Sequence, residues 1–276
     1  MPHDGLPGDR GTVDFHAHAF PDDLAARAVA GVVASAGSVP ALDGRLSSLL
    51  ASMDAAGVQR SVVLSIATRP AQFQSIRAWS REIAGSRIVP LLSVHPADPE
   101  AGRKVLAAAR DGILGFKLHS YYQDFDLDDR VVDPLYAALQ ETGLLCVAHT
   151  GYDTVFPMTR RADPVRIARV LERFPRLRFM ATHLGAWKDW QLVRTHLAGA
   201  DLWVDTSYSI EYMPREAARE LILSFPPDRV LFGSDSPWAD QAASIASLRG
   251  LGLGAEREQA ILGENARLLL DRGGLP

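Results

Sequence analysis

Cysteine is almost missing from this sequence. Its 276 residues include one cysteine, Cys146, so no disulfide bond can form within the chain. A chain of this length can bury a sizeable core without cross-links. Cys146 lies in the apolar run LLCVAH, where we expect the small thiol to pack in the core.

An excess of positive charge is also missing, and so are long hydrophobic runs. The formal net charge is −4, which gives no basic field to attract nucleic acid or anionic lipid. No apolar run approaches the roughly 18 residues of a membrane span, and the polar residues 1–11 lack the apolar segment of a signal peptide. We therefore expect a cytoplasmic protein that binds a small molecule, not nucleic acid or a membrane.

Short apolar runs alternate along the chain with amphipathic stretches. The runs are rich in β-branched residues and are typical of buried strands. They lie at 11–18, 60–67, 87–95, 112–119, 144–151, 177–185, 202–208 and 229–238. The amphipathic stretches repeat apolar residues every three or four positions, which predicts helices. Seven of these lie at 46–57, 71–85, 99–112, 133–143, 163–175, 190–199 and 214–226.

This alternation predicts the fold class. Strands that alternate with helices pair in parallel through right-handed crossovers. Eight such repeats in about 250 residues suit a closed (β/α)8 TIM barrel better than an open sheet, which usually stops near six strands. Since no boundary of composition divides the chain, we predict a single α/β domain over 1–276. Two connections are long, one after the first strand through Ala41 and one at 151–164, and such loops commonly cover a substrate.

Histidines gather at one end of the predicted strands. Six of the eight follow this pattern, namely His16, His18, His95, His119, His149 and His183. His3, in the leader, and His196, in a predicted helix, do not. Because the carboxyl ends of barrel strands meet at one mouth, where catalytic groups gather, the sequence predicts a ring of imidazoles there.

The spacing of His16 and His18 suits metal ligands. Residues i and i+2 of a strand share a face, about 6.6 Å apart, so both imidazoles can bind one ion with bonds of about 2.0–2.1 Å. Asp14 shares this parity and could brace the pair from below. His149 can supply a third nitrogen and Asp235, in FGSDSPW, a carboxylate oxygen. Such ligands with an open position are typical of a hydrolytic or lytic zinc site, although they also suit Mn²⁺, Fe²⁺ or Co²⁺.

Six motifs, VDFHAH, GFKLH, VAHTG, THLGA, GSDSPW and ILGENARLLL, resemble the amidohydrolase superfamily in order over nearly the whole chain. The likeness is greatest to the amidohydrolase-2 group, which includes aminocarboxymuconate-semialdehyde decarboxylase and related metal-dependent hydrolases. The resemblance implies a distorted (β/α)8 barrel with a divalent metal, usually Zn²⁺, held by His16, His18, His149 and Asp235. It further implies that His183 acts as acid and base beside the metal, while Asp235 helps to take a proton from water.

Lys117 has two readings under this resemblance. In some amidohydrolases the lysine of the fourth strand is carboxylated and bridges two metal ions, whereas in the closer group a lysine here accompanies one. We favour one Zn²⁺ ion and place Lys117 on the substrate side or as an electrostatic group. His119 and His95 could orient the substrate or support the ligands from behind.

Further rim residues allow both a structural and a functional interpretation. Trp187 and Trp238 could wall the pocket or simply pack. Arg160 and Arg161, on the long loop, are better read as a solvated charge pair than as a clamp for a substrate carboxylate. Asp205, at the end of the seventh strand, is better read as a structural hydrogen-bond acceptor.

These features together predict an enzyme. We expect a metal-dependent hydrolase that uses activated water on a small, carboxylated organic substrate. A nonoxidative decarboxylase of an unsaturated or aromatic acid would use the same residues and stays open. A metal-independent lactonase-like enzyme and a non-catalytic binding barrel fit less well, because the ligands and His183 are all retained. A homodimer is a general expectation for such a protein.

Overall fold

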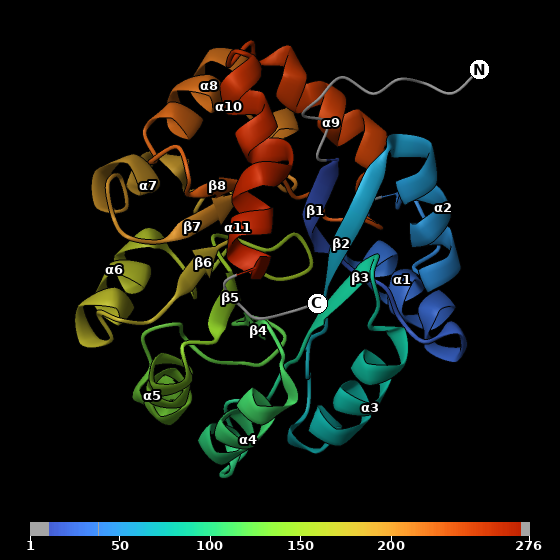
Figure 1. The fold of residues 1–276 in the computed structure, drawn as a ribbon. Coiled ribbons are helices and arrows are strands. Elements are labelled where there is room, and N and C mark those ends of the chain that lie inside the picture. Colours follow the sequence, from blue (N-terminus) through green and yellow to red (C-terminus); the bar gives the residue numbers. More distant parts are fainter. Residues whose placement is uncertain (1–10, 38, 272–276) are drawn as a thin grey trace.

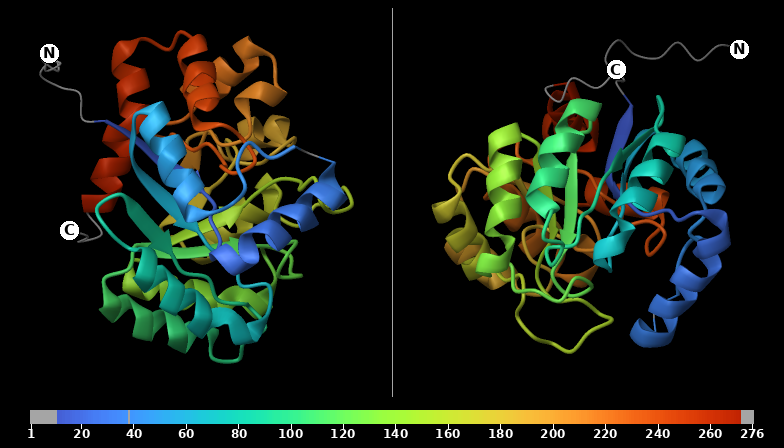
Figure 2. Two further views of the ribbon diagram at one scale, coloured as in Figure 1. Left: turned by 90° about the vertical axis from the view of Figure 1, so that its right-hand side faces the viewer. Right: turned by 90° about the horizontal axis from the view of Figure 1, so that it is seen from below.

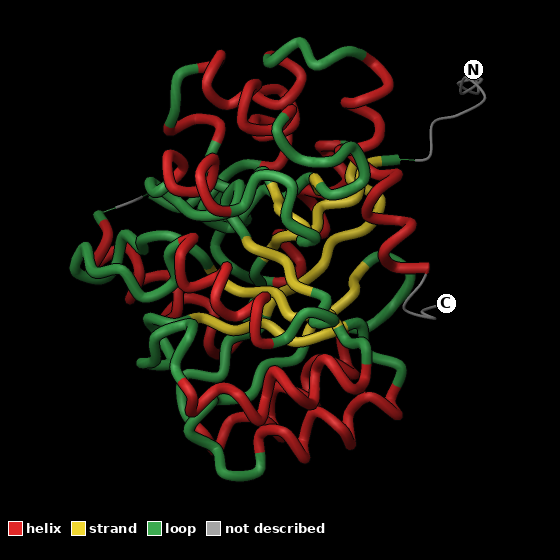
Figure 3. Tube along the Cα trace, turned by 90° about the vertical axis from the view of Figure 1, so that its left-hand side faces the viewer, coloured by secondary structure: helices red, strands yellow, loops and turns green. Residues whose placement is uncertain are grey.

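The computed structural model describes residues 11–37 and 39–271. His3 and nearly all of the polar leader lie outside these ranges. The described chain forms a ring of parallel strands surrounded by helices (Figure 1). Figure 3 shows the strands as an inner layer enclosed by helices. Within the described ranges, no helix is both long and apolar enough to cross a membrane.

The strands follow the order predicted from the sequence, and every paired neighbour is parallel. Most are shorter than the apolar runs that suggested them. They are β1 Thr12–Ala17, β2 Val58–Leu64, β3 Ile88–Leu91, β4 Gly115–His119, β5 Leu145–His149, β6 Phe179–Ala181, β7 Trp203–Asp205 and β8 Val230–Leu231. Cys146 on β5 is fully buried, as expected.

Helices follow the strands and cover the outside of the ring. The α-helices are α1 Asp22–Ala36, α2 Leu46–Ala56, α3 Phe73–Ile83, α4 Ala101–Ala108, α5 Asp133–Thr142, α6 Pro164–Arg173, α7 Trp190–His196, α8 Arg215–Leu223, α9 Gln241–Gly250, α10 Ala255–Gln259 and α11 Asn265–Asp271. Short 3-10 turns are η1 Pro70–Gln72, η2 Ala109–Asp111, η3 Arg130–Val132 and η4 Ile210–Tyr212, and η5 Ala260–Glu264 is a π-helix. The local sequence explains where α6 begins. The Asp163 side chain caps the helix by accepting a hydrogen bond from the Val165 amide at 3.1 Å, and Pro164 occupies the first turn.

The barrel is distorted, because regular pairing divides the strands into two sheets. One sheet has the order β1-β2-β3 and the other β4-β5-β6-β7-β8. A few backbone hydrogen bonds join the sheets at each seam. Between β3 and β4, the Leu92 amide donates to the Gly115 carbonyl at 3.1 Å and the Lys117 amide donates to the Leu92 carbonyl at 2.8 Å. Between β1 and β8, the Phe15 amide donates to the Phe232 carbonyl at 2.8 Å.

Apolar side chains fill the inside of the ring, and α11 covers one end. Val62, Val147 and Met180, from three strands, belong to one buried cluster with Ala266 and Leu269 of α11. Figure 1 shows α11 crossing the middle of the ring. A barrel filled in this way is a packed core and not a pore. The carboxyl ends of the strands, which α11 does not cover, are therefore available for a functional site.

Helix α1 lies where the sequence predicted a long loop. Residues Asp22–Ala36 of the connection after the first strand are helical. Alanine and glycine make up much of this helix, and its buried residues are only Ala25 and Val29, so its sequence lacks a strong apolar stripe. Figure 2 shows α1 standing out to the side of the barrel.

A bulge in β1 changes which way its side chains face. Asp14 pairs with Ser61 of β2, but Ala17 pairs with Val63, so three steps along β1 match two along β2. Such an extra residue breaks the alternation of the strand. The Asp14 carboxylate therefore accepts a hydrogen bond from Gln241 of α9 at 2.7 Å. Its Oδ1 also accepts the backbone amide of His16 at 3.1 Å, so Asp14 braces the first of the two histidines through the backbone.

Candidate active site

A cavity of about 460 Å³ lies at the carboxyl ends of the strands. Most of the residues singled out in the sequence line it, namely His16, His18, Lys117, His119, His149, His183, Trp187, Asp235 and Trp238. His95 does not belong to this lining. It lies four residues beyond the end of β3, where its Nδ1 accepts the Ala97 amide at 3.1 Å. The predicted ring therefore brings together five of the six histidines.

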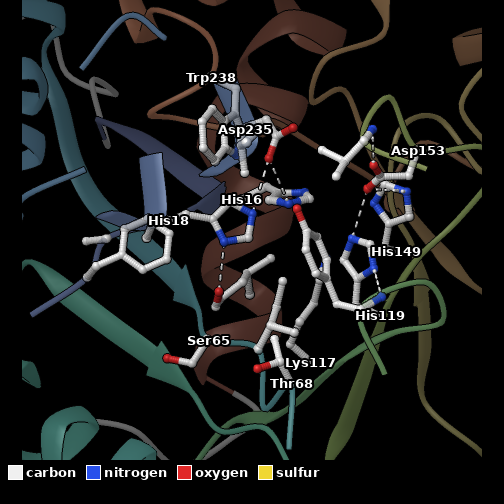
Figure 4. A pocket seen from close by; sticks show the side chains of 18 of the residues that line it. His16, His18, Ser65, Thr68, Lys117, His119, His149, Asp153, Asp235 and Trp238 are labelled. Atoms are coloured by element: carbon white, nitrogen blue, oxygen red, sulfur yellow. Dashed lines mark hydrogen bonds and ion pairs between the residues drawn. The ribbon is translucent and has the colours of Figure 1, made fainter. Parts of the chain in front are cut away.

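His16 and His18 direct the same nitrogen atom toward one carboxylate. Their Nε2 atoms lie 3.2 Å and 3.3 Å from Asp235 Oδ1, as Figure 4 shows. Their Nδ1 atoms face away: that of His16 lies 2.8 Å from Asp205 Oδ2, and that of His18 lies 2.8 Å from the Leu64 carbonyl oxygen. Since these acceptors place the proton on Nδ1, both Nε2 lone pairs point at the position that Asp235 faces.

His183 links the two sides of the cavity: its ligand atom lies within 4.8 Å of those of His16 and Asp235, and it faces His149, which groups in the same way with His119 and Asp153. His183 Nε2 lies 3.0 Å from His149 Nδ1. The other nitrogens donate to carbonyl oxygens, His183 Nδ1 to Ser207 at 3.0 Å and His149 Nε2 to Tyr152 at 3.1 Å. The two facing nitrogens are thus both lone-pair acceptors. Two lone pairs at this distance repel each other, so the arrangement fits a cation beside them.

The charge states of these groups also suit a metal site. Burial holds the pKa of His16 and of His149 well below the usual imidazole value, and nearby Lys117 acts in the same direction on His16. Both imidazoles are therefore neutral, the form that binds metal. Burial raises the pKa of Asp235, but attraction to the surrounding imidazoles, that of His16 above all when it carries a proton, outweighs burial and lowers this pKa below its usual value. Neutral imidazoles and an ionised carboxylate are typical ligands of a divalent cation.

The backbone at the site is strained. His183 has a φ angle of 59° and Asp235 one of 69°, a left-handed conformation that costs a non-glycine residue about 1–3 kcal/mol. Gly233 supports this arrangement by its lack of a side chain, since a Cβ atom there would lie 2.8 Å from His16 Cβ. The strain indicates that both side chains are held where function requires them.

A second cluster lies on the opposite side of the cavity (Figure 4). The rings of His119 and His149 stack with centroids 4.1 Å apart, and His119 Nε2 lies 3.3 Å from Asp153 Oδ2. Lys117 lies nearby on β4, where its Nζ is buried and has no hydrogen-bond partner among the described residues. Burial lowers the pKa of Lys117 to about 8. The side chain thus faces the cavity as an uncommitted donor, and its role stays a prediction.

Three rim residues gained importance only in the structure. Asp205 is fully buried and contacts His16, so its acceptor role serves the site itself. Asp153 and Tyr208 line the cavity. A sequence signal existed for each of the three: Asp205 and Tyr208 belong to the seventh strand run, LWVDTSY, and Asp153 follows closely on VAHTG.

The two arginines of the long loop do not line the cavity. Arg160 binds Asp189 through two hydrogen bonds of 3.1 Å and 3.0 Å. Arg161 lies 2.9 Å from Asp124. Since both guanidinium groups are paired outside the cavity, nothing here supports a clamp for a substrate carboxylate.

Solved structures with the same fold are numerous, whereas a search of curated proteins finds no match. An uncharacterized TIM-barrel protein of Bordetella bronchiseptica is 22% identical, with 96% of this chain and 99% of that chain covered and a TM-score of 0.74. A mutant 5-carboxyvanillate decarboxylase of Novosphingobium aromaticivorans with bound manganese is 16% identical, with 96% and 99% covered and a TM-score of 0.72. A probable 2-pyrone-4,6-dicarboxylic acid hydrolase of Acinetobacter baumannii is 14% identical, with 94% and 99% covered and a TM-score of 0.65. Such identities show the fold alone, and they confirm the predicted TIM barrel.

The sequence itself gives the family. The model of the family described as amidohydrolase matches residues 13–272. This span includes the whole site, from His16 on β1 to Asp235 after β8. The chain therefore belongs to the amidohydrolase family.

Proposed function

We propose that this protein is a hydrolase that depends on one divalent metal ion, Zn²⁺ in the first instance, and acts on a small organic substrate. The observation that carries the proposal is the meeting of His16 Nε2 and His18 Nε2 at Asp235 Oδ1. His149 would complete the set of ligands. When bound, a divalent ion polarises a substrate oxygen and makes water more acidic.

His183 is the proposed acid and base. Its Nδ1 lies 3.0 Å from the Ser207 carbonyl oxygen, to which it donates, so Nε2, which faces His149 Nδ1 at 3.0 Å, is the atom that would exchange protons with the substrate. Asp235 is ionised and lies within reach, so it can help to take the proton from the attacking water. His183 Nε2 receives that proton and then passes it to the leaving group.

The proposal includes one ion and not two. A second ion would need Lys117 to be carboxylated, whereas the buried amine as it stands offers a cation or a neutral donor to the substrate. Mn²⁺, Fe²⁺ or Co²⁺ would suit the same nitrogen and oxygen ligands. We keep Lys117 and His119 as groups that contact or orient the substrate.

Nonoxidative decarboxylation is the second candidate. The matched structures favour it to the extent that several bear the printed name of a decarboxylase, two of them with manganese. The residues would be the same: the ligand set would hold the acid, and His183 Nε2 would deliver a proton to the carbon that loses carbon dioxide. A panel of aromatic acids, unsaturated acids, lactones and amides separates the two activities, because carbon dioxide release is measured independently of hydrolysis.

The division of roles is tested by His183→Asn. We expect the variant to keep its metal content and to lose turnover by about 10²–10⁴-fold, the usual contribution of a positioned acid–base group. His196→Asn, on the exposed face of α7, is the matched control and should change neither. Loss of metal in His183→Asn would make this residue a ligand and overturn the assignment.

A further inference from the structure

The cavity extends beyond the histidines as an apolar groove. Leu24, Ala28 and Val32 of α1 line one wall, and Ile66, Ile76 and Trp79, from the segment after β2 and from α3, line the other. We call this part of the cavity the α1–α3 groove. It belongs to the same cavity as His16 and Asp235, so one ligand can occupy both.

Several polar groups along the groove bind each other, whereas Arg27 of α1 lines the cavity as a charged side chain. The Thr68 hydroxyl donates to Gln72 Oε1 at 3.1 Å, and the Arg69 amide donates to the same oxygen at 2.8 Å. The Ser75 hydroxyl donates to the Gln72 carbonyl at 2.9 Å. Thr68 lies on the side of the cavity away from Asp153 and Asp235 (Figure 4). A ligand in the groove therefore meets apolar surface beside one charged side chain, that of Arg27.

Helix α1 buries few of its apolar residues in the core of the protein. Only Ala25 and Val29 are buried in it, and Leu24 is 37% exposed. Exposed apolar surface at the mouth of a cavity gains stability when a ligand covers it, at about 25 cal/mol per Å². The imidazole and carboxylate groups gather at one end of the cavity, and the other end is apolar apart from Arg27, which matches a substrate with a reacting head and an apolar arm.

We propose that the substrates of this enzyme carry an extended hydrocarbon arm that lies in the α1–α3 groove while the reacting group lies at His183. The placement of the reacting group rests on the proposed function. The arm itself rests on the composition of the groove. This inference excludes compact polar acids as the preferred substrates.

The test is a series of metal-binding ligands that differ only in chain length. Acetohydroxamic, butanohydroxamic, hexanohydroxamic and octanohydroxamic acid are titrated calorimetrically into the Zn²⁺-loaded protein. If the chain enters the groove, affinity rises about two- to fourfold for each added methylene group. An affinity that does not change with chain length overturns the proposal, while leaving the metal site intact.

Two variants locate the arm. Val32→Asp places a charge in the groove and should lower the affinity for octanohydroxamic acid at least tenfold more than that for acetohydroxamic acid. Leu223→Asp, on α8, is the matched control, because Leu223 is 46% exposed and does not line the cavity. Equal losses in both variants, or no loss in Val32→Asp, contradict the proposal.

A failure of the proposed function can be told apart from a failure of the groove. If acetohydroxamic acid does not bind at all, the metal site is wrong, and 1-hexanol and 1-octanol then test the groove without any metal-binding group. Tighter binding of 1-octanol that Val32→Asp abolishes supports the groove. Binding that ignores both chain length and this substitution overturns it.

Discussion

Asp205 and His16 form a buried pair in which the carboxylate Oδ2 accepts the Nδ1 proton of the imidazole at 2.8 Å. The same carboxylate, through Oδ1, accepts the backbone amide of His183 at 2.9 Å and the amide of Ser207 at 3.1 Å. Asp205 therefore fixes a proposed metal ligand and the proposed acid–base residue at once. It is a positioning residue, since it does not line the cavity.

Replacing this carboxylate tests its influence on the metal. In Asp205→Asn the side-chain amide cannot accept as strongly from both His16 Nδ1 and the His183 backbone amide, so the His16 ring loses its fixed orientation. We expect the affinity for Zn²⁺ to fall about 10–100-fold, the usual effect of losing such a partner, as measured by competition with a chromophoric chelator. Asp201→Asn, whose side chain is 86% exposed beside Arg229, is the control. Unchanged affinity for Zn²⁺ in Asp205→Asn would show that Asp205 does not position His16 for metal binding.

Gly233 offers a steric test of the same contact. A Cβ atom there would lie 2.8 Å from His16 Cβ and 3.3 Å from Asp205 Cβ, so Gly233→Ala must displace one of them. We expect a lower melting temperature and weaker Zn²⁺ binding together. Gly250→Ala is the control, because nothing lies within 4 Å of its Cβ; that change should stabilise α9 by about 0.5–1 kcal/mol. Equal melting temperatures and equal Zn²⁺ affinities in the two variants would contradict the close approach of Gly233 to His16.

How much of this site the sequence predicted depended on where each residue stands relative to its strand. Histidines at strand ends were placed correctly, because all strand ends of a barrel meet at one rim whatever shape the loops take. The prediction that His95 lies at this rim was wrong, because β3 ends at Leu91 and the chain has left the rim four residues later. Asp14 does hold the backbone amide of His16, but the bulge in β1 could not be predicted, because it leaves no mark in the pattern of apolar residues.

The same contrast holds for the fold. Eight strand runs with helices between them were sufficient to predict the barrel. Helix α1 was not predicted, since its alanine-rich sequence packs few large side chains. The α1–α3 groove could not be predicted either, because it depends on how a surface helix lies against α3, which is a matter of tertiary contacts.

Arg160 anchors the loop that carries Tyr152 and Asp153. Its two hydrogen bonds reach Asp189, whose side chain is 6% exposed. We expect Arg160→Ala to release this loop, so that limited proteolysis cleaves within 151–163 faster and the KM for substrate rises. Arg161→Ala is the matched control, because its partner Asp124 is 86% exposed and contributes little order. Equal cleavage of both variants would show that the Asp189 contact does not hold the loop.

Asp128 gives a prediction for the pH dependence of stability. Burial raises its pKa, but hydrogen bonds from Arg169 and Arg166 outweigh burial, so the folded-state pKa lies below the usual value. A depressed carboxyl pKa contributes stability above the unfolded-state pKa of about 3.9 and loses it as the pH falls through the folded value. Asp128→Asn should therefore lower the melting temperature at pH 7 and lose this effect toward pH 2.

The control for this pH dependence is Glu172→Gln, which replaces an exposed carboxylate on the neighbouring helix α6. Its melting temperature should follow that of the unmodified protein at every pH. A deficit of Asp128→Asn that persists undiminished at pH 2 would mean that the ion pairs of Asp128 are not its cause.

The central claim is that His16, His18, His149 and Asp235 together bind one divalent ion. Elemental analysis of the purified protein, with and without His18→Ala, tests it most directly, with circular dichroism to check that the variant is folded. The account predicts one equivalent of Zn²⁺ or a related divalent metal for each chain, lost in the folded variant. Two equivalents would point to a bridged pair at Lys117. No metal after incubation with Zn²⁺, or full metal content in the variant, would contradict the account.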